Sequence, residues 1–152
     1  MPQENPSSTD RDAEMMLVAK SAKGNKLPVI VAGDFNDVAW SQSTTLFKDL
    51  SGLLDPRIGR GFYNTFSANS YLMRWPLDHF FASDEFRLIT MQVGEDIDSD
   101  HFPAYFEVQL EPEKAAEQTP EEPTQDQKED AEEQIKEARE DNAVENKEEK
   151  QK

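Results

Sequence analysis

The sequence contains no cysteine, which excludes a disulfide framework and any zinc site built from cysteine ligands. It has no apolar run near the roughly 18 residues that a membrane-spanning helix needs. The first ten residues are polar and lack the basic start and apolar centre of a signal peptide. We therefore expect a soluble chain, and the sequence assigns it to no compartment.

Positive charge is also scarce. The chain carries 16 Lys and Arg against 32 Asp and Glu, a formal net charge of −16. Tight, sequence-independent binding to nucleic acid needs clustered Lys and Arg, and the sequence shows no strong patch of this kind. A phosphate-bearing substrate held through a metal ion is still compatible with the charge.

Aromatic residues are absent from residues 112–152, which hold 15 acidic and 7 basic side chains. Their β-branched aliphatic residues are Ile135 and Val144 alone. Such a segment cannot bury enough apolar surface to offset its ordering entropy, so we predict a disordered acidic tail over 112–152. The i,i+4 spacing of Glu132 and Lys136 allows a transient helix there. Residues 1–111 form the remaining domain, with the folding unit at about 8–111.

Residues 8–111 combine helical periodicity with short strand-like runs, and this mixture predicts an α/β fold. Gly24 and Gly52 are expected to end the two helices, and Ser43 or Thr44 to cap the second. The aromatic-rich loop over 53–77 either takes part in function or closes the end of the sheet. The predicted elements are helices over 9–23 and 44–52 and strands over 29–32, 77–82, 86–93 and 104–110.

The stretch 29–37 reads Val-Ile-Val-Ala-Gly-Asp-Phe-Asn-Asp, a β-branched run that ends in polar residues. On an extended backbone Asp34 and Asn36 would point the same way, toward the rim of a sheet. The alternative is an ordinary strand followed by a turn rich in Asp and Asn.

The chain has two histidines, and each directly follows an aspartate: Asp78-His79 and Asp100-His101. Both pairs, like Asp34, lie beside a predicted strand, so the three clusters could meet at one rim. Carboxylates suit a hard cation such as Mg²⁺, and an imidazole oriented by a carboxylate can donate to phosphoryl oxygens. The set therefore suggests metal-assisted hydrolysis of a phosphoester.

Three motifs in order resemble the endonuclease/exonuclease/phosphatase superfamily: Gly-Asp-Phe-Asn at 33–36, Trp-Pro-Leu-Asp-His-Phe-Phe at 75–81 and Ser-Asp-His-Phe-Pro at 99–103. The stretch 8–63 looks most like a bacterial subgroup of unassigned substrate, whose members often carry membrane-spanning helices ahead of the catalytic domain. The resemblance covers about residues 7–111 and implies the C-terminal half of a four-layer α/β/β/α sandwich.

Carried over residue by residue, the resemblance implies four catalytic residues. Asp34 would orient and activate the attacking water, and Asn36 would hold the scissile phosphate. His101 would stabilise the transition state, and Asp78 would accept its ring N–H.

The resemblance also implies metal and substrate contacts. Asp100, with Asp34, would hold Mg²⁺ or Mn²⁺ or its water shell. Trp75 would lie near the substrate pocket, although core packing is the competing interpretation. His79 occupies a position that varies among relatives, and we interpret it as a flanking, sheet-edge histidine.

The principal metal-ligand Glu of the superfamily comes from an N-terminal half that cannot be located in this sequence. We therefore expect weak or no hydrolysis by this chain alone, and activity with a complementary N-terminal half. The half-domain should expose an apolar face built from Val29, Val31, Phe80, Leu88 and Phe106.

These observations predict a Mg²⁺-dependent phosphodiesterase or endonuclease-like hydrolase that is incomplete in this chain. Candidate substrates are nucleic acid, a phospholipid head group or a small phosphodiester, and the acidic composition disfavours duplex DNA. The alternative is a non-catalytic remnant or binding module with an acidic interaction tail.

Overall fold

The computed structural model describes residues 8–61, 63–66, 74–120 and 122–136. Helices and strands are mixed along the chain, as the α/β prediction requires. The elements are α1 (Ser8–Lys23), β1 (Ile30–Asp34), α2 (Gln42–Ser51), β2 (Asp78–Ala82), β3 (Phe86–Val93), β4 (Ala104–Leu110) and the short 3₁₀ helix η1 (Pro112–Glu117). In the described part of the chain, no helix combines the length and apolar character that crossing a membrane requires.

Helix α2 is capped by a serine hydroxyl at its N-terminus and by a glycine at its C-terminus. The Ser41 side chain accepts a hydrogen bond from the Thr44 backbone N–H at 3.0 Å, and Gly52 ends the helix at φ 69°. That left-handed conformation favours glycine. The predicted caps, Ser43 or Thr44, were wrong, because the hydroxyl two or three residues earlier is the one placed to accept from the first turn.

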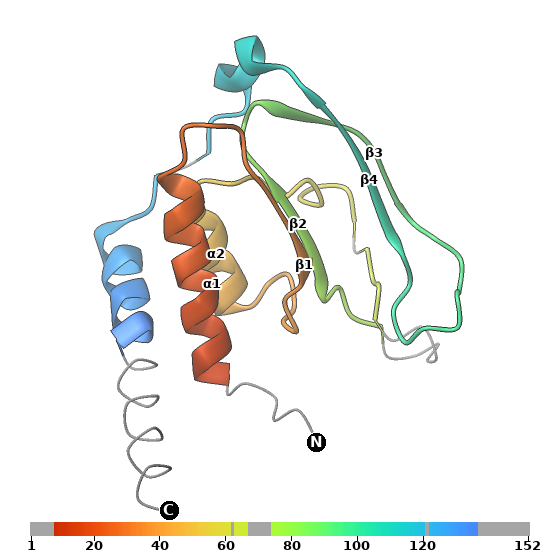
Figure 1. The fold of residues 1–152 in the computed structure, drawn as a ribbon, viewed down its shortest axis with the longest axis horizontal. Coiled ribbons are helices and arrows are strands. Elements are labelled where there is room, and N and C mark those ends of the chain that lie inside the picture. The colour runs from red at the N-terminus through yellow and green to blue at the C-terminus, as the bar shows by residue number, and fades with distance from the viewer. Residues whose placement is uncertain (1–7, 62, 67–73, 121, 137–152) are drawn as a thin grey trace, which may run out of the picture.

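The four strands form two separate antiparallel pairs, β1–β2 and β3–β4. The register of β1–β2 runs from Ile30 opposite Ala82 to Asp34 opposite Asp78. The β3–β4 pair has a register irregularity between Leu88 and Thr90. Figure 1 shows the helices on one side of β1–β2 and the long β3–β4 ribbon arching on the other.

The core lies between β1–β2 and the helices. Its buried members include Met16 of α1, Phe47 of α2 and Phe81 of β2. Because side chains alternate along a strand, the opposite face of β2 carries Asp78, Phe80 and Ala82. The two site-bearing strands are thus fixed to a packed helical layer through one face, and the other face is left for the site.

The predicted exposed apolar face is wrong in part. Val29 and Val31 pack against the helical core instead of facing away from it. Phe80 is buried, and its ring stacks on Phe106 with centroids 4.4 Å apart. The alternation of side chains along β1 directs Val31 toward the helices, as it does Val29 just before the strand. The hydrophobic pattern alone does not indicate this direction.

Part of the acidic tail is helical rather than disordered. Residues 125–136 form a helix whose Ala131 and Ile135 are buried in the same core cluster as Met16. Ion pairs join Lys20 to Glu132 at 3.5 Å and Lys23 to Glu122 at 3.1 Å. The two apolar residues four apart form a stripe sufficient to dock on α1. Residues 137–152 lie outside the described part, and a domain boundary at 111 stays a prediction.

Candidate active site

Two carboxylates stand opposite each other at the end of β1–β2. Asp34 is the last residue of β1 and Asp78 the first of β2, and they are register partners. Residues paired across antiparallel strands place their side chains on the same face, with Cβ atoms roughly 5 Å apart. Like charges in this position repel, so the pair calls for a positive or hydrogen-bonding group between them.

His101 supplies that group. Its Nδ1 donates to Asp78 Oδ2 across 2.8 Å, while its Nε2 lies 3.7 Å from Asp34 Oδ2. The first contact is a hydrogen bond, whereas the second is too long for one. The imidazole is therefore oriented by Asp78, and its Nε2 is turned toward Asp34 at the edge of the site.

The surroundings of His101 favour its charged form. Desolvation lowers the pKa of His101, but the hydrogen bond and charge of Asp78, together with the charges of Asp34 and Asp100, outweigh it and raise the pKa. A histidine with a raised pKa carries a larger cationic fraction near neutral pH. It can then donate a charge-assisted hydrogen bond from Nε2 to an anionic oxygen.

The turn after β1 is not extended. Asn36 has φ 50°, a left-handed conformation that asparagine tolerates better than most residues, and its backbone N–H donates to Asp34 Oδ1 at 2.7 Å. The expectation that Asp34 and Asn36 point the same way on extended backbone was therefore wrong. The carboxylate of Asp34 folds over its own turn, which leaves Oδ2 directed at His101.

Hydrogen bonds from three parts of the chain hold this turn in place. Arg11 of α1 donates to the Asn36 carbonyl at 3.0 Å, and the Phe35 N–H donates to the Leu77 carbonyl at 3.1 Å. The Asp37 side chain accepts from the Val38 N–H at 2.8 Å and from the Ser41 hydroxyl at 2.7 Å. The turn is thus fixed to α1, to the N-cap of α2 and to the residue before β2, which suits a site that depends on position.

His101 is brought to β1–β2 by a short strand-like contact that the sequence did not indicate. Phe66 forms antiparallel bridges with Trp75 on one side and His101 on the other. Bridged residues share a face, so the three side chains form one row, in which the Phe66 and His101 rings lie 5.0 Å apart. Trp40 extends the row, with its ring 6.5 Å from that of Trp75.

Trp40 and Trp75 are 54% and 43% exposed, so their rings line an open surface that leads away from His101. Trp75 was anticipated from the motif that contains Asp78. Trp40 was missed, although its position three residues after Asp37 in a turn that follows the first motif is a usable signal.

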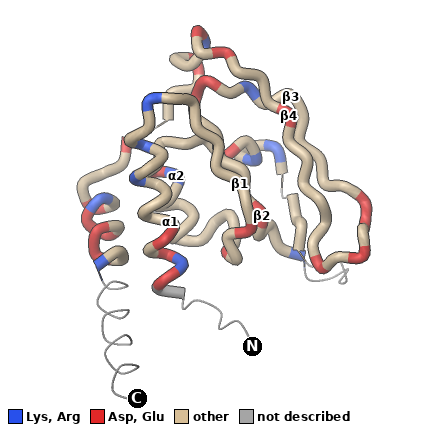
Figure 2. Tube along the Cα trace, viewed as in Figure 1, with Lys and Arg blue, Asp and Glu red and all other residues tan. Residues whose placement is uncertain are grey.

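Acidic residues surround this end of the molecule. Figure 2 shows acidic residues both near the ends of β1 and β2 and at the connection between β3 and β4. Asp100 belongs to that connection; it is exposed and adds to the charge around His101. The described residues include no group of three or more His, Asp and Glu side chains suited to holding a metal ion.

The donor set therefore does not fit a complete Mg²⁺ site. One oxygen of Asp34 already accepts from Asn36, and the other faces His101. A compact octahedral Mg²⁺ shell needs further oxygen ligands. The expected metal pair, Asp34 and Asp100, is insufficient among the residues described.

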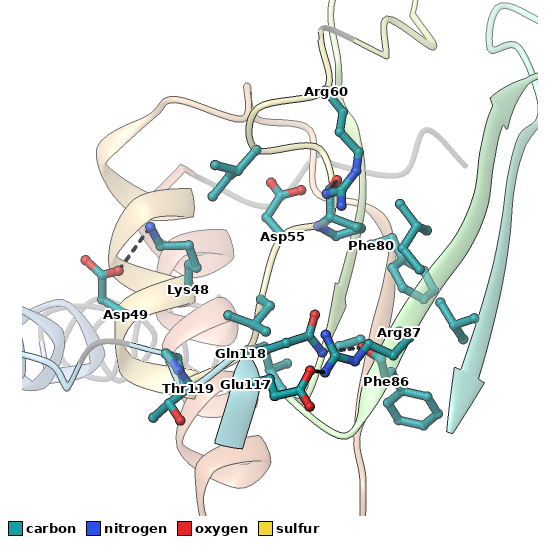
Figure 3. A pocket seen from close by; sticks show the side chains of 18 residues that line it. Lys48, Asp49, Asp55, Arg60, Phe80, Phe86, Arg87, Glu117, Gln118 and Thr119 are labelled. Atoms are coloured by element: carbon teal, nitrogen blue, oxygen red, sulfur yellow. Dashed lines mark hydrogen bonds and ion pairs between the residues drawn. The ribbon is translucent and has the colours of Figure 1, made fainter. Parts of the chain in front are cut away.

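A cavity of about 660 Å³ opens farther along the same face of β2, where Phe80 and Ala82 line it together with residues of α2, β3, β4 and η1. Figure 3 shows its mixed lining, in which charged side chains such as Lys48 and Arg87 lie among apolar ones such as Phe80. Neither Asp34, Asp78 nor His101 lines it. We therefore place the candidate site at the Asp34–His101–Asp78 cluster and not in this cavity.

Comparison with known proteins assigns the chain to a lineage. The model of the Endonuclease/Exonuclease/phosphatase family matches residues 2–101. A mannosyl-6-phosphatase of Bacteroides thetaiotaomicron VPI-5482 is similar in structure, with 25% identity and a TM-score of 0.51 over 70% of this chain and 48% of that chain. An endonuclease/exonuclease/phosphatase family protein from Bacteroides thetaiotaomicron is 28% identical, with a TM-score of 0.50 over 64% of this chain and 43% of that one.

The chain thus spans less than half the length of these two solved structures. No curated protein matches it significantly. The similar region contains β1, β2 and the connection that carries His101, so the candidate site lies within the family match.

Proposed function

We propose a hydrolytic function because this chain belongs to the endonuclease/exonuclease/phosphatase family. Membership supports a phosphoester hydrolase lineage. The observation that carries the proposal is the placement of His101 between Asp78 and Asp34. A single imidazole, oriented by one carboxylate and facing another, suits transfer of a phosphoryl group to water.

Each residue of the cluster has a role set by its contacts. Asp78 keeps the His101 ring in one orientation through Nδ1, so that Nε2 donates to a phosphoryl oxygen as negative charge develops. Asp34 Oδ2 accepts from the attacking water and directs it at phosphorus. Asn36, exposed on the adjoining turn, offers its side-chain amide to the scissile phosphate.

We further propose that activity depends on Mg²⁺ or Mn²⁺. The described residues lack a complete set of ligands, and the chain spans less than half of its solved relatives. The missing ligands would therefore come from a complementary N-terminal half, in the same polypeptide or a separate one.

Two substrate classes follow. A small phosphodiester fits the family and the acidic charge of the chain. A sugar phosphate monoester is the second candidate, because Trp40 and Trp75 are two partly exposed indoles beside the site and one similar structure is a mannosyl-6-phosphatase. Indole faces pack against the apolar face of a sugar ring through dispersion contacts.

The competing proposal is a non-catalytic remnant or binding module of this fold. Its support is the incomplete metal-ligand set among the described residues. In that case the acidic residues of the tail would bind cations or basic partners.

One experiment separates these proposals. The chain and a version extended at its N-terminus by the other half of the family fold are assayed with bis-p-nitrophenyl phosphate, mannose 6-phosphate and plasmid DNA, in Mg²⁺ or EDTA. We expect turnover by the extended version only, and its loss in EDTA and in His101→Ala. Turnover by the chain alone that His101→Ala abolishes would contradict the need for a second half. No turnover by either version would favour the binding module.

A further inference from the structure

Three polar side chains form a buried cluster directly behind the candidate site. His79 of β2 is 2% exposed and Arg57 5% exposed, and Asp55 is similarly buried. Arg57 is bound to the Asp55 carboxylate through Nη2 at 2.6 Å and through Nε at 2.9 Å. The sequence indicated none of these contacts, and His79 was expected at a sheet edge.

The hydrogen bonds determine the protonation of His79. Arg57 Nη2 lies 2.8 Å from His79 Nδ1, and a guanidinium can only donate, so Nδ1 accepts. Nε2 therefore carries the proton and donates to the Asp37 carbonyl at 2.8 Å. His79 is thus a neutral imidazole in a single tautomer, with both nitrogens satisfied.

This cluster contacts both segments that carry the site. His79 binds the Asp37 carbonyl in the turn that contains Asp34 and Asn36. Arg57 Nη1 donates to the backbone carbonyl of Asp78 at 3.2 Å. The His79 ring also stacks on Phe35, with centroids 4.9 Å apart.

We propose that Arg57 and His79, held by Asp55, are positioning residues that set the spacing between the Asp34 turn and Asp78. The proposal rests on the proposed function at one point: the distance between the Asp34 turn and Asp78 matters for hydrolysis because the carboxylates of Asp34 and Asp78 flank His101. Neither Arg57 nor His79 contacts the reacting groups.

Stability alone does not account for the cluster. The His79 ring lies between Phe35 and Phe81, with centroids 4.9 and 5.6 Å away, so its two faces meet the kind of apolar surroundings that a phenyl ring would also fill. Burying an ion pair and an imidazole requires desolvating all of them, and well-packed apolar replacements are often as stable. What an apolar ring could not supply is a directional link between the Asp37 and Asp78 backbones.

The test compares His79→Phe with His79→Gln. Phenylalanine keeps the ring and loses both hydrogen bonds, whereas the glutamine amide can accept from Arg57 and donate to Asp37. The chain has two tryptophans, Trp40 and Trp75, which lie three residues after Asp37 and three before Asp78. Their exciton couplet in circular dichroism therefore reports the spacing of the two segments without any turnover.

We expect His79→Phe to lose at least half of the couplet and His79→Gln to retain it. Exchange of the Phe35 amide proton, which bonds to Leu77 across the same gap, should accelerate at least tenfold in His79→Phe alone. Leu50→Ala is the matched control, since it weakens the core without touching the cluster. If His79→Phe does not fold, Arg57→Lys replaces it, because lysine keeps the charge and cannot reach Asp55, His79 and Asp78 together.

An unchanged couplet and unchanged Phe35 exchange in a folded His79→Phe or Arg57→Lys variant would overturn the proposal. An equal loss in Leu50→Ala would also overturn it, since the effect would then follow stability alone. Neither measurement depends on hydrolysis, so failure of the proposed function leaves the outcome readable.

Discussion

Asp34 and Asp78 face each other on the last rung of β1–β2, and His101 lies between their carboxylates. The strand register places the two negative charges together. The imidazole of His101 belongs to the β3–β4 connection, which is distant from Asp34 in the sequence. The two carboxylates repel each other, and the positive charge of protonated His101 offsets this repulsion. His101 therefore stabilises the folded state in addition to any role in hydrolysis. The site is therefore coupled to the junction between the two sheets.

A double-mutant cycle tests this coupling. In the wild-type background Asp78→Asn removes a charge-assisted hydrogen bond and should destabilise the fold by about 1 kcal/mol. In a His101→Phe background the same change relieves carboxylate repulsion and should be neutral or stabilising. Urea unfolding of the four proteins gives the coupling free energy, and strict additivity would contradict the arrangement.

The left-handed backbone of Asn36 leads to a second prediction. At φ 50°, alanine incurs a steric penalty that glycine avoids, so Asn36→Ala should be about 1 kcal/mol less stable than Asn36→Gly. Both variants lose the side-chain amide, which makes them matched for everything except backbone preference. Equal free energies of unfolding in urea would show that the turn relaxes to φ below zero.

The sequence was sufficient to locate the strands and the three motifs. Runs such as 29–32 and 77–82 end at turn residues, and the observed β1 and β2 differ from them by one or two residues. The family resemblance paired Asp78 with His101, and the structure places a hydrogen bond there. The strands and motifs could be located from the sequence because they depend on residues that are close together in the chain.

What the sequence could not indicate depends on distant contacts. Arg57 lies in an irregular loop, and its contact with His79 arises only when that loop crosses behind β2. Ile135 lies in an acidic segment whose composition argues for disorder, and its burial depends on the apolar side of α1. In both cases the residue that makes the contact is more than 20 residues away in the sequence, so the local sequence pattern does not indicate it.

The protonation of His79 predicts how stability changes with pH. Desolvation, followed by the charge of Arg57, lowers the pKa of His79 below its ordinary value of 6.5, while the Asp37 carbonyl and the charges of Asp55 and Asp37 oppose the shift. The unfolded chain therefore binds a proton first as pH falls through about 6.5, so the free energy of unfolding should decrease below that pH. Urea unfolding at pH 7.5 and 5.5 measures the loss.

His79→Gln is the control for that experiment, because glutamine does not titrate and can keep both hydrogen bonds. The difference between wild type and His79→Gln isolates His79 from His101, whose raised pKa acts in the opposite direction. A difference that does not change with pH would contradict the buried, neutral state of His79.

The helix over residues 125–136 provides the last prediction. Ile135 is buried against the core that includes Met16 and Ala19 of α1. Truncating it to alanine should lower the free energy of unfolding by about 2 kcal/mol, through lost apolar burial and the cavity left behind. Glu133, exposed on the same helix, is the matched control, and Glu133→Ala should change stability by less than about 0.5 kcal/mol. If both variants unfold at the wild-type urea concentration, the helix is not part of the cooperative fold, and the acidic tail begins before residue 125.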